Sequence, residues 1–226
     1  MNKKYNAVKE RITKPVYSLD EALDLLGQTS ITKFDPTVET HFKLNVDLSK
    51  PEQTVRGITT LPHGTGKKIT VAALVSKDHE KEAKESKADI IGGEELITKI
   101  GTGFTDFDIV IASPDMMSKL GKVAKILGQK GLMPNPKSGT ITTDIGKVIS
   151  QIKAGRIEFR MDKNGNVHQA IGKLSWGHEK IKENFINFYH SLIGNRPAGI
   201  KGSFIGTTSI NVTMGPAIKI DTKSIE

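Results

Sequence analysis

The chain of 226 residues contains no cysteine. It therefore has no disulfide, thiolate zinc site, iron–sulfur cluster or cysteine nucleophile, which is typical of an intracellular protein. Long apolar runs are absent as well: the longest uncharged stretch, 202–218, is rich in Gly, Ser and Thr, and no window approaches the ~20 apolar residues of a membrane span. The basic amino-terminal segment lacks the apolar core of a secretory signal. We therefore expect a cytoplasmic location and no membrane partner.

Local enzyme motifs are also missing. The run at 63–68 (HGTGKK) lacks the first glycine and the Ser or Thr of a phosphate loop, and 101–106 lacks the third glycine of the dinucleotide pattern. The His-Glu pairs that begin at His79 and His178 have no histidine four residues on, and no GxSxG surrounds a serine. We expect no catalytic residues, no metal and no cofactor.

Positive charge is in excess. Lys and Arg number 33 against 25 Asp and Glu, a net charge of +8, and such a balance favours polyanionic partners. Two windows hold no carboxylate: one from Asp115 to Asp144, which contains five lysines, and one from Glu183 to Asp221. These windows predict local positive potential, although a solvated helix face explains Lys119, Lys122 and Lys125 as well.

The amino-terminal part predicts mixed helix and antiparallel strand. Ser18 and Glu21 form a capping-box pattern before a helix that runs to Gly27, which would be the first helix of the fold. Alternating apolar residues predict a half-exposed strand over 37–48, and a second strand over 54–61 is expected to pair with it in antiparallel fashion.

The middle of the chain alternates strand with helix, which is typical of a parallel sheet covered by helices. Strands are predicted at 69–75, 88–91 and 107–113. One helix is predicted over 114–127 with Ser113 as its cap and a proline at its first position, and another over 144–153.

Antiparallel structure returns after residue 155. The sequence predicts a hairpin over 156–174 with its turn at Asn164–Gly165, then a helix over 178–193 and one or two final strands. The prediction is an α+β domain formed by both chain ends, 1–66 plus 156–226, with an inserted α/β Rossmann-like domain at 67–155. The chain would cross between the two domains twice, and these two crossings would form a hinge. Its expected residues are Pro62, Gly64, Gly66 and Gly155.

Three runs in the same order resemble the bacterial ribosomal protein L1 family: TVETHFKLNVD with QTVRGITTLPHGTGK, LGKVAKILGQKGLMPNPKSGTIT, and KGSFIGTTSINVTMGP. The resemblance covers essentially the whole chain. It implies a structural constituent of the large ribosomal subunit, with no enzymatic activity, whose discontinuous domain binds 23S rRNA at the mobile stalk. It further implies assistance in the release of deacylated tRNA from the E site, and translational repression by binding the mRNA of the protein's own operon. We expect a monomer when the protein is free.

The resemblance also implies a set of RNA-binding residues. They come from the segment before the first strand and the strand itself, from the hairpin, and from the last run. In chain order they are Lys33, Phe34, Thr37, Glu39, His41, Arg160, His168, Gly172, Lys173, Ser175, Thr213, Met214 and Gly215.

These residue types suit RNA, because Lys and Arg neutralise phosphates and small residues let a strand edge approach ribose hydroxyls. Other roles stay open for three of them. Phe34 could be a core residue, Thr213 an ordinary strand threonine, and Glu39 a cross-strand partner of a lysine.

The chain departs from the family pattern at Gln129, where a proline is common, and at Met161, where an asparagine is common. The first would loosen a loop and the second remove a hydrogen bond near the RNA face. The loop at 128–140 could contact RNA, tRNA or nothing. Two rival functions are a nucleotide-binding enzyme that uses the inserted α/β domain, and a generic basic RNA-binding module.

Overall fold

A computed structural model describes residues 3–76, 79–222 and 225 of the chain. The chain forms two compact units: residues up to Gly66 together with those from Ile157 onward, and Lys67–Arg156 between them. The sequence also predicts a boundary after residue 66, and it predicts the second boundary after residue 155, one residue earlier than in the structure. Over the described ranges, no helix is both long and apolar enough to cross a membrane.

The first unit is built on an antiparallel sheet of four strands in the order β7-β1-β8-β9. Its strands are β1 (Thr37–Leu44), β7 (Asn166–Lys173), β8 (Ile205–Val212) and β9 (Ile218–Ile220). Side chains alternate along β1, with Val38, Phe42 and Leu44 buried and Lys43 exposed, as the sequence pattern predicts. One face of the sheet is therefore core and the other is polar.

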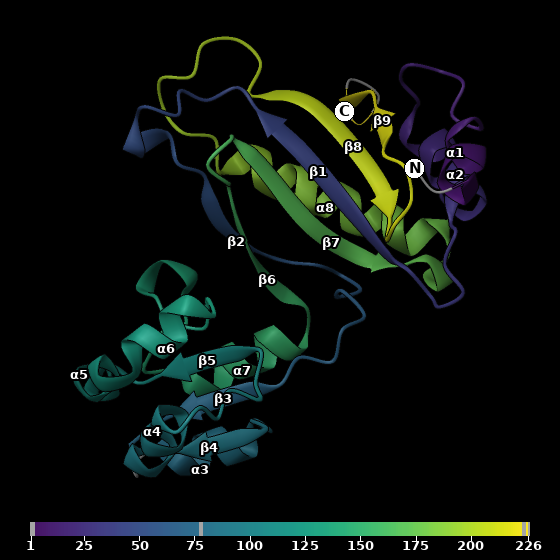
Figure 1. The fold of residues 1–226 in the computed structure, drawn as a ribbon. Coiled ribbons are helices and arrows are strands. Elements are labelled where there is room, and N and C mark those ends of the chain that lie inside the picture. Colours follow the sequence, from purple (N-terminus) through teal and green to yellow (C-terminus); the bar gives the residue numbers. More distant parts are fainter. Residues whose placement is uncertain (1–2, 77–78, 223–224, 226) are drawn as a thin grey trace. The chain divides into compact units, whose positions relative to one another are not determined.

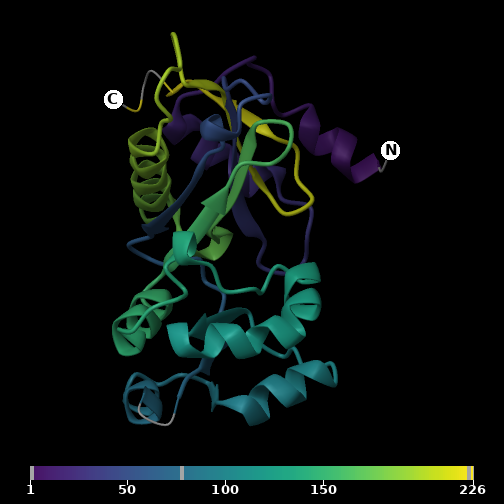
Figure 2. The ribbon, with the colours of Figure 1, turned by 90° about the vertical axis from the view of Figure 1, so that its left-hand side faces the viewer.

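Helices cover the core face. The helices of this unit are α1 (Lys3–Lys9), α2 (Leu19–Thr29) and α8 (His178–Gly194), with short 3-10 turns at Pro51–Gln53 and Leu174–Trp176. Phe42 on β1 packs against Phe185 and Phe188 of α8, with ring centroids 5.8 and 5.7 Å apart. Figure 1 shows α8 running behind the sheet, and the view turned by 90° shows it on one side of the strands (Figure 2).

The α2 prediction is confirmed. The Ser18 hydroxyl accepts the backbone N–H of Glu21, and the Glu21 carboxylate accepts the backbone N–H of Ser18, which completes the capping box. The prediction that this is the first helix is wrong, because α1 precedes it. Only Val8 of α1 is buried, so the segment carries little of the apolar periodicity that predicts a helix.

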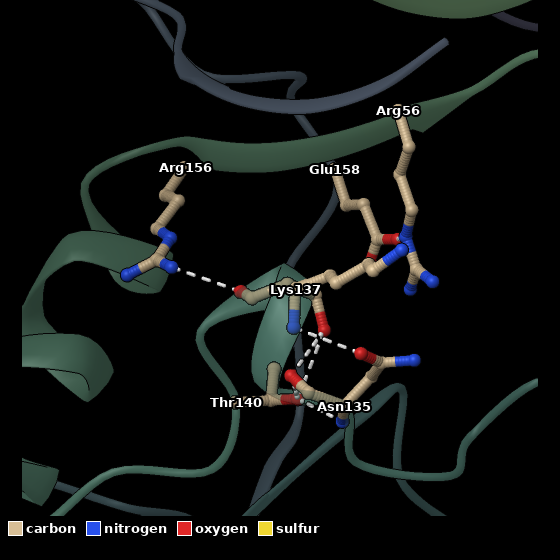
Figure 3. Close-up of polar contacts among 7 residues, drawn as sticks. Arg56, Asn135, Lys137, Thr140, Arg156 and Glu158 are labelled. Carbon is tan, nitrogen blue, oxygen red and sulfur yellow. Dashed lines mark hydrogen bonds and ion pairs between the residues drawn. The ribbon is translucent and has the colours of Figure 1, made fainter. Parts of the chain in front are cut away.

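Two strand pairings differ from the prediction. The strand β2 (Arg56–Thr60) forms a separate two-stranded sheet with β6 (Arg156–Arg160) and does not pair with β1. In the predicted hairpin, β6 and β7 lie in different sheets and share only the isolated bridge between Met161 and Val167. Arg56 and Glu158 form an ion pair across β2 and β6 (Figure 3). The helix α8 packs on both β2 and β7, one strand from each of these sheets.

The first predicted strand is also shorter than expected. It ends at Leu44 instead of residue 48, and Leu48 is 55% exposed. The backbone N–H of Asp47 donates to the side chain of Gln53 at 2.7 Å, and the Asp47 carboxylate accepts the N–H of Ser49 at 3.1 Å. These local bonds hold a turn where apolar alternation alone predicts a strand.

The second unit contains a parallel sheet, as predicted, in the order β4-β3-β5. Its strands are β3 (Val71–Leu74), β4 (Ile90–Gly92) and β5 (Ile109–Ala112). Val71 and Ala73 of the fully buried β3 face one apolar cluster, which includes α7 (Ile145–Lys153), and Ala72 and Leu74 face another, which includes α4 (Glu94–Gly101). Helices thus cover both faces.

The helix predicted over 114–127 is broken. Its pieces are a 3-10 turn (Pro114–Met116), α5 (Met117–Leu120), a 3-10 turn (Gly121–Val123) and α6 (Ala124–Gln129). The break falls at Gly121, which favours helix poorly. Ser113 is not a side-chain cap, since its buried hydroxyl has no hydrogen-bond partner among the described residues. The other elements of this unit are α3 (Glu80–Glu85) and a 3-10 turn (Pro136–Ser138).

Candidate nucleic-acid interface

The first part of the candidate interface is the end of the four-stranded sheet where β1 begins and β7 and β8 end (Figure 1). The Thr213 hydroxyl accepts the backbone N–H of Thr37 at 3.1 Å and lies 3.3 Å from the Thr37 carbonyl. Lys173 Nζ donates to the Thr37 hydroxyl at 2.9 Å. Three of the predicted RNA-binding residues, which lie far apart in the sequence, thus form one hydrogen-bonded group. Thr213 is the residue directly after the end of β8.

Beside this group the chain turns sharply at Met214. Its φ of +64° lies in the left-handed region that is unfavourable for a bulky side chain, and its side chain is 66% exposed. Gly215 closes the turn by donating its N–H to the Val212 carbonyl at 2.7 Å. A Cβ on Gly215 would lie 2.7 Å from Val212 Cγ2, so only glycine fits. A strained backbone therefore holds a large apolar side chain in solvent.

The segment before β1 adds a second exposed apolar side chain. Phe34 is 58% exposed, so the alternative role as a core residue is wrong. Lys33 beside it is exposed and has no ion pair in the described part of the chain. Asp35 anchors the segment, because its carboxylate accepts the backbone N–H of Ser175 at 3.0 Å and the Ser175 hydroxyl at 2.8 Å. The predicted Ser175 therefore joins the same end of the sheet.

The second part of the candidate interface is the polar face of the sheet. The strand register places its side chains in rows across β7, β1 and β8. The members are Glu39, His41, Lys43, Asn166, His168, Ala170, Thr207, Ser209 and Asn211. Glu39 lies between Ala170 and Asn211, so no lysine is its direct cross-strand neighbour. Arg160 is exposed but lies on β6, in the other sheet.

Histidines form the centre of this face. Nδ1 of His41 lies 2.8 Å from Nδ1 of His168, and Nε2 of His41 lies 2.6 Å from Oδ1 of Asn211. Nε2 of His168 lies 3.5 Å from the Asp162 carboxylate. The prediction names both histidines but neither Asn211 nor Asp162. Alternation in 205–212 would place Asn211 on the polar face, whereas its contact with His41 follows only from register.

Asp162 organises the turn before β7. It accepts the backbone N–H of Asn166 at 2.7 Å and that of Asn164 at 2.8 Å. These bonds, that of Asn166 first, lower the pKa of Asp162 to about 2. The neighbouring Met161 is half-buried against the core and donates its N–H to the Val55 carbonyl at 2.9 Å. The residue that departs from the family pattern thus contacts the interior.

Gly172 differs from the other predicted RNA-binding residues because it is buried. A Cβ on Gly172 would lie 3.0 Å from Cε3 of Trp176, and one on Gly66 would lie 2.8 Å from Cζ2 of the same ring. Both glycines make room for the indole. Gly172 supports the surface from beneath, and Lys173 is the neighbouring residue that presents its side chain.

The predicted hinge residues are tied to the unit that each belongs to. Asn184 of α8, which is fully buried, accepts the His63 N–H at 3.1 Å and donates to the carbonyls of Gly64 at 2.9 Å and Ile171 at 2.7 Å. Pro62 is exposed within this anchored loop. Gly155, with φ of +105°, terminates α7 and donates its N–H to the Ile152 carbonyl at 3.1 Å.

The same anchoring bears on the rival nucleotide site at 63–68. A phosphate loop presents free backbone N–H groups between a strand and a helix. Here the N–H of His63 is already bound to Asn184, and the strand β3 follows the run instead of a helix. The local structure does not resemble a phosphate loop.

The loop at 128–140 is folded on itself within the second unit (Figure 3). Asn135 accepts the Lys137 N–H at 2.8 Å through its side chain and donates its own N–H to the Thr140 hydroxyl at 2.9 Å. Arg156 donates to the Ser138 carbonyl at 2.9 Å. The Lys137 side chain is left exposed on a well-bonded loop. Gln129, near the start of this range, is the last residue of α6.

Comparisons with known proteins cover nearly the whole chain. The sequence model of the ribosomal protein L1p/L10e family matches residues 26–216. The large ribosomal subunit protein uL1 of Fervidobacterium nodosum is 47% identical over 222 residues, which are 97% of this chain and 94% of its own length. The protein of the same name from Phytoplasma australiense is 47% identical over 221 residues, 97% of this chain and 96% of its own length. That from Thermosipho africanus is 46% identical over 222 residues, 97% of this chain and 96% of its own length.

Proposed function

The chain belongs to the ribosomal protein L1 family, and from this premise we propose that the end of its four-stranded sheet binds stalk rRNA. Membership makes it a structural protein of the large ribosomal subunit, located on cytoplasmic ribosomes, rather than an enzyme. The RNA proposed as its main partner is the 23S rRNA of the mobile stalk. The residues that follow are those that the resemblance implies, and their geometry and chemistry support the proposal.

The observation that carries the proposal is the pair of large apolar side chains, Phe34 and Met214, exposed at the end of the sheet. Burial in the core is the usual place for such side chains, and the left-handed backbone at Met214 adds a cost of about 1–2 kcal/mol. A partner that covers these two side chains removes their apolar surface from water, and this favours binding. Unstacked RNA bases stack on aromatic rings, and each stacked base contributes about 1–3 kcal/mol.

The polar residues around the two apolar ones match the RNA backbone. Lys33 and Lys173 supply positive charge for phosphates, while the hydroxyls of Thr37, Thr213 and Ser175 lie where ribose 2′-hydroxyls would come close. Gly215 has no Cβ that would collide with Val212, so the turn that presents Met214 can form. An apolar centre with a hydrogen-bonding rim suits single-stranded or bulged RNA better than a regular duplex.

The roles implied for tRNA and mRNA are part of the proposal. The lysines of the acid-free window in the second unit, between Asp115 and Asp144, are proposed to contact E-site tRNA and to assist its release. The surface that binds stalk rRNA is proposed to bind the protein's own operon mRNA as well, and so to repress its translation. The free protein is proposed to be a monomer, with a hinge at the two crossings between its units.

Binding to a stalk-derived rRNA fragment, compared with an unrelated hairpin of equal length across a salt series, tests the proposal. We expect the stalk fragment to bind about a thousandfold tighter at physiological salt, the lower end of the range for specific nucleic-acid binders. Equal weak binding of both, lost together as salt rises, would show a generic basic module. Saturable ATP or NAD binding would favour the enzyme instead.

Lys173 gives a sharper form of this test. Lys173→Ala should lower the slope of log affinity against log salt by up to about one unit if its ammonium contacts a phosphate. Lys180→Ala is the matched control, because Lys180 is exposed on α8, outside the proposed surface. An unchanged slope in Lys173→Ala removes this residue from the contact.

A further inference from the structure

Two imidazole rings face each other at the centre of the polar sheet face. His41 on β1 and His168 on β7 are direct cross-strand neighbours, and their Nδ1 atoms are 2.8 Å apart. The other nitrogen of His41 contacts Asn211, and the other nitrogen of His168 is directed at Asp162. The contacts therefore run in one line, Asp162 to His168 to His41 to Asn211, across the turn and three strands.

The contacts suit one assignment of the ring hydrogens. With a hydrogen on Nε2, His41 donates to Oδ1 of Asn211, whose amide nitrogen donates to the Val212 carbonyl. Nδ1 of His41 then accepts, and Nδ1 of His168 donates. A first extra proton fits on Nε2 of His168, where the Asp162 carboxylate lies 3.5 Å away. A second extra proton does not fit, because two N–H groups would then face each other across 2.8 Å.

The second proton therefore opens the pair. Each ring would then be an imidazolium with an Nδ1–H group released toward solvent, and the His168 side chain is already 55% exposed. Histidine rings take up protons between about pH 5 and 8, so such opening lies within reach of ordinary conditions. An anion close to the rings would favour the doubly protonated state.

The surrounding charges leave room for such an anion. Glu39 and Lys43 flank His41 on the same face of β1, and Lys219 on β9 lies opposite Ser209, the β8 neighbour of His41. Asp162 is the remaining charged neighbour, and the hydrogen bonds that lower its pKa to about 2 keep its carboxylate ionised between about pH 5.5 and 8. Two carboxylates and two ammonium groups surround the rings, so the protonation state of the pair decides the sign of the local charge.

We propose that the His41–His168 pair is a proton-linked phosphate contact of the RNA interface. A phosphodiester approaching the sheet face draws protons from solvent onto the rings, the pair opens, and the imidazolium N–H groups bind the phosphate oxygens. The inference rests on the proposed RNA-binding function and deepens it, since it assigns these two residues a titrating role within the contact surface.

Binding of the stalk-derived rRNA fragment between pH 5.5 and 8 tests the inference. Because protons are taken up on binding, the affinity should fall as pH rises, by up to about tenfold per pH unit for each linked proton. Calorimetry in two buffers of different ionisation heat should show uptake of about one to two protons per complex. The double variant His41→Gln, His168→Gln should lose both effects, because glutamine keeps hydrogen bonding but does not titrate.

His190→Gln is the matched control, because His190 is exposed on α8, the helix that packs on the opposite face of the sheet. It should retain the pH dependence and proton uptake of the unchanged protein. Specific binding that does not vary with pH, or that varies equally in the double variant, overturns the inference and leaves the proposed function standing.

Nitrogen-15 NMR of the free protein distinguishes failure of the coupled histidine pair from failure of the proposed RNA-binding function. Coupled rings should titrate in two steps, and in His168→Gln a single step should remain at His41. Independent single-step titration of both rings in the unchanged protein overturns the pair itself. If no stalk RNA binds at any pH, the proposed function fails and the phosphate contact fails with it, even where the coupled titration is observed.

Discussion

At position 214 the chain holds a bulky side chain in a backbone conformation that favours glycine. Such strain persists where the surrounding structure enforces it, and here the bonds of Thr213 to Thr37 and of Gly215 to Val212 do so. Stability alone would favour glycine at this position. The exposed methionine is therefore the residue at which binding and stability should separate most clearly.

Met214→Gly should have effects of opposite sign on stability and binding. Removing the strained side chain should stabilise the fold by about 0.5–1 kcal/mol, the relief of left-handed strain less the added chain entropy of glycine. Affinity for the stalk fragment should fall by about 1–2 kcal/mol with the loss of apolar contact. Chemical denaturation and RNA titration measure the two quantities.

Lys87→Gly is the control, because Lys87 is the other non-glycine residue with positive φ in the described part of the chain. It should change stability in the same direction and leave RNA affinity as it was.

Phe34→Ala should weaken binding by about 1–3 kcal/mol, the contribution of one stacked base, without lowering the melting temperature. A methionine variant that binds as tightly as the unchanged protein would contradict the assigned contact.

Asp162 predicts a pH dependence of stability. Its pKa in the folded protein, about 2, lies below the usual value of 3.8, so its stabilising effect is complete above about pH 5 and is lost as pH falls toward 2. We expect about 1 kcal/mol from this group after allowing for solvent screening, since its side chain is 34% exposed.

Urea denaturation of Asp162→Asn at pH 6, 4 and 3 measures this effect. The difference in unfolding free energy between the variant and the unchanged protein should shrink as pH falls. Asp106→Asn, at an exposed position outside this turn, should show no comparable trend. A difference that stays constant with pH would assign the cost to geometry and not to charge.

At the scale of elements, α8 does more than cover the sheet. Its buried Asn184 binds two loop residues and the strand β7 with one side chain, so the helix fixes the chain that leaves the first unit. The apolar periodicity of 178–193 predicts the helix but not this clamp. A polar side chain on the core face of a helix implies a hydrogen-bond partner, but the sequence does not show which backbone groups that partner comes from.

Asn184→Ala should destabilise the first unit by about 2–4 kcal/mol, because the buried carbonyl of Ile171 and the partly buried backbone groups of His63 and Gly64 would lose their partner. Asn187→Ala is the control on the same helix, since Asn187 is half-buried and accepts one hydrogen bond, from Thr59 at 3.2 Å, so a loss of about 1 kcal/mol or less is expected. The single tryptophan, Trp176, packs against Gly66 in the same loop and reports its loosening by fluorescence. Equal losses in both variants would contradict the clamp.

At the scale of the whole molecule, we propose that the two units move about the two crossings between them. The bonds of Gly64 and Gly155 lie within the unit to which each residue belongs, so the proposed pivot would lie in the peptide units beyond them. Two short connections between compact units favour hinge motion over independent tumbling. The proposed tRNA role requires such motion.

Spin labels on introduced cysteines measure this motion. The chain contains no cysteine, so none has to be replaced before labelling. The double variant Lys122→Cys, Lys180→Cys places one label on each unit at exposed positions. We expect a broad distance distribution in the free protein that narrows when the stalk fragment is bound. Lys180→Cys with Lys201→Cys, both within the first unit, is the control and should give a narrow distribution in either state. One narrow distribution across the units in all conditions would rule out the hinge.

The sequence by itself determined the local elements and the family. Alternation placed the buried face of β1, the capping box placed α2, and three long runs in the same order were enough for the resemblance that the comparisons confirmed. Composition and net charge indicated a polyanionic partner. These features depend on residues close in the chain, so sequence spacing carries them.

Tertiary structure decided the rest, because it depends on which distant strands pair. The pairing of β2 with β6 and the placement of β6 and β7 in different sheets do not follow from local pattern, whereas the break at Gly121 agrees with the poor helix propensity of glycine. The contact between His41 and His168 joins positions 127 residues apart, and a shift of one residue in register would send one ring into the core. The resemblance implies that Phe34 and Met214 bind RNA, and the fold shows that both side chains lie in solvent and that Met214 has a left-handed backbone.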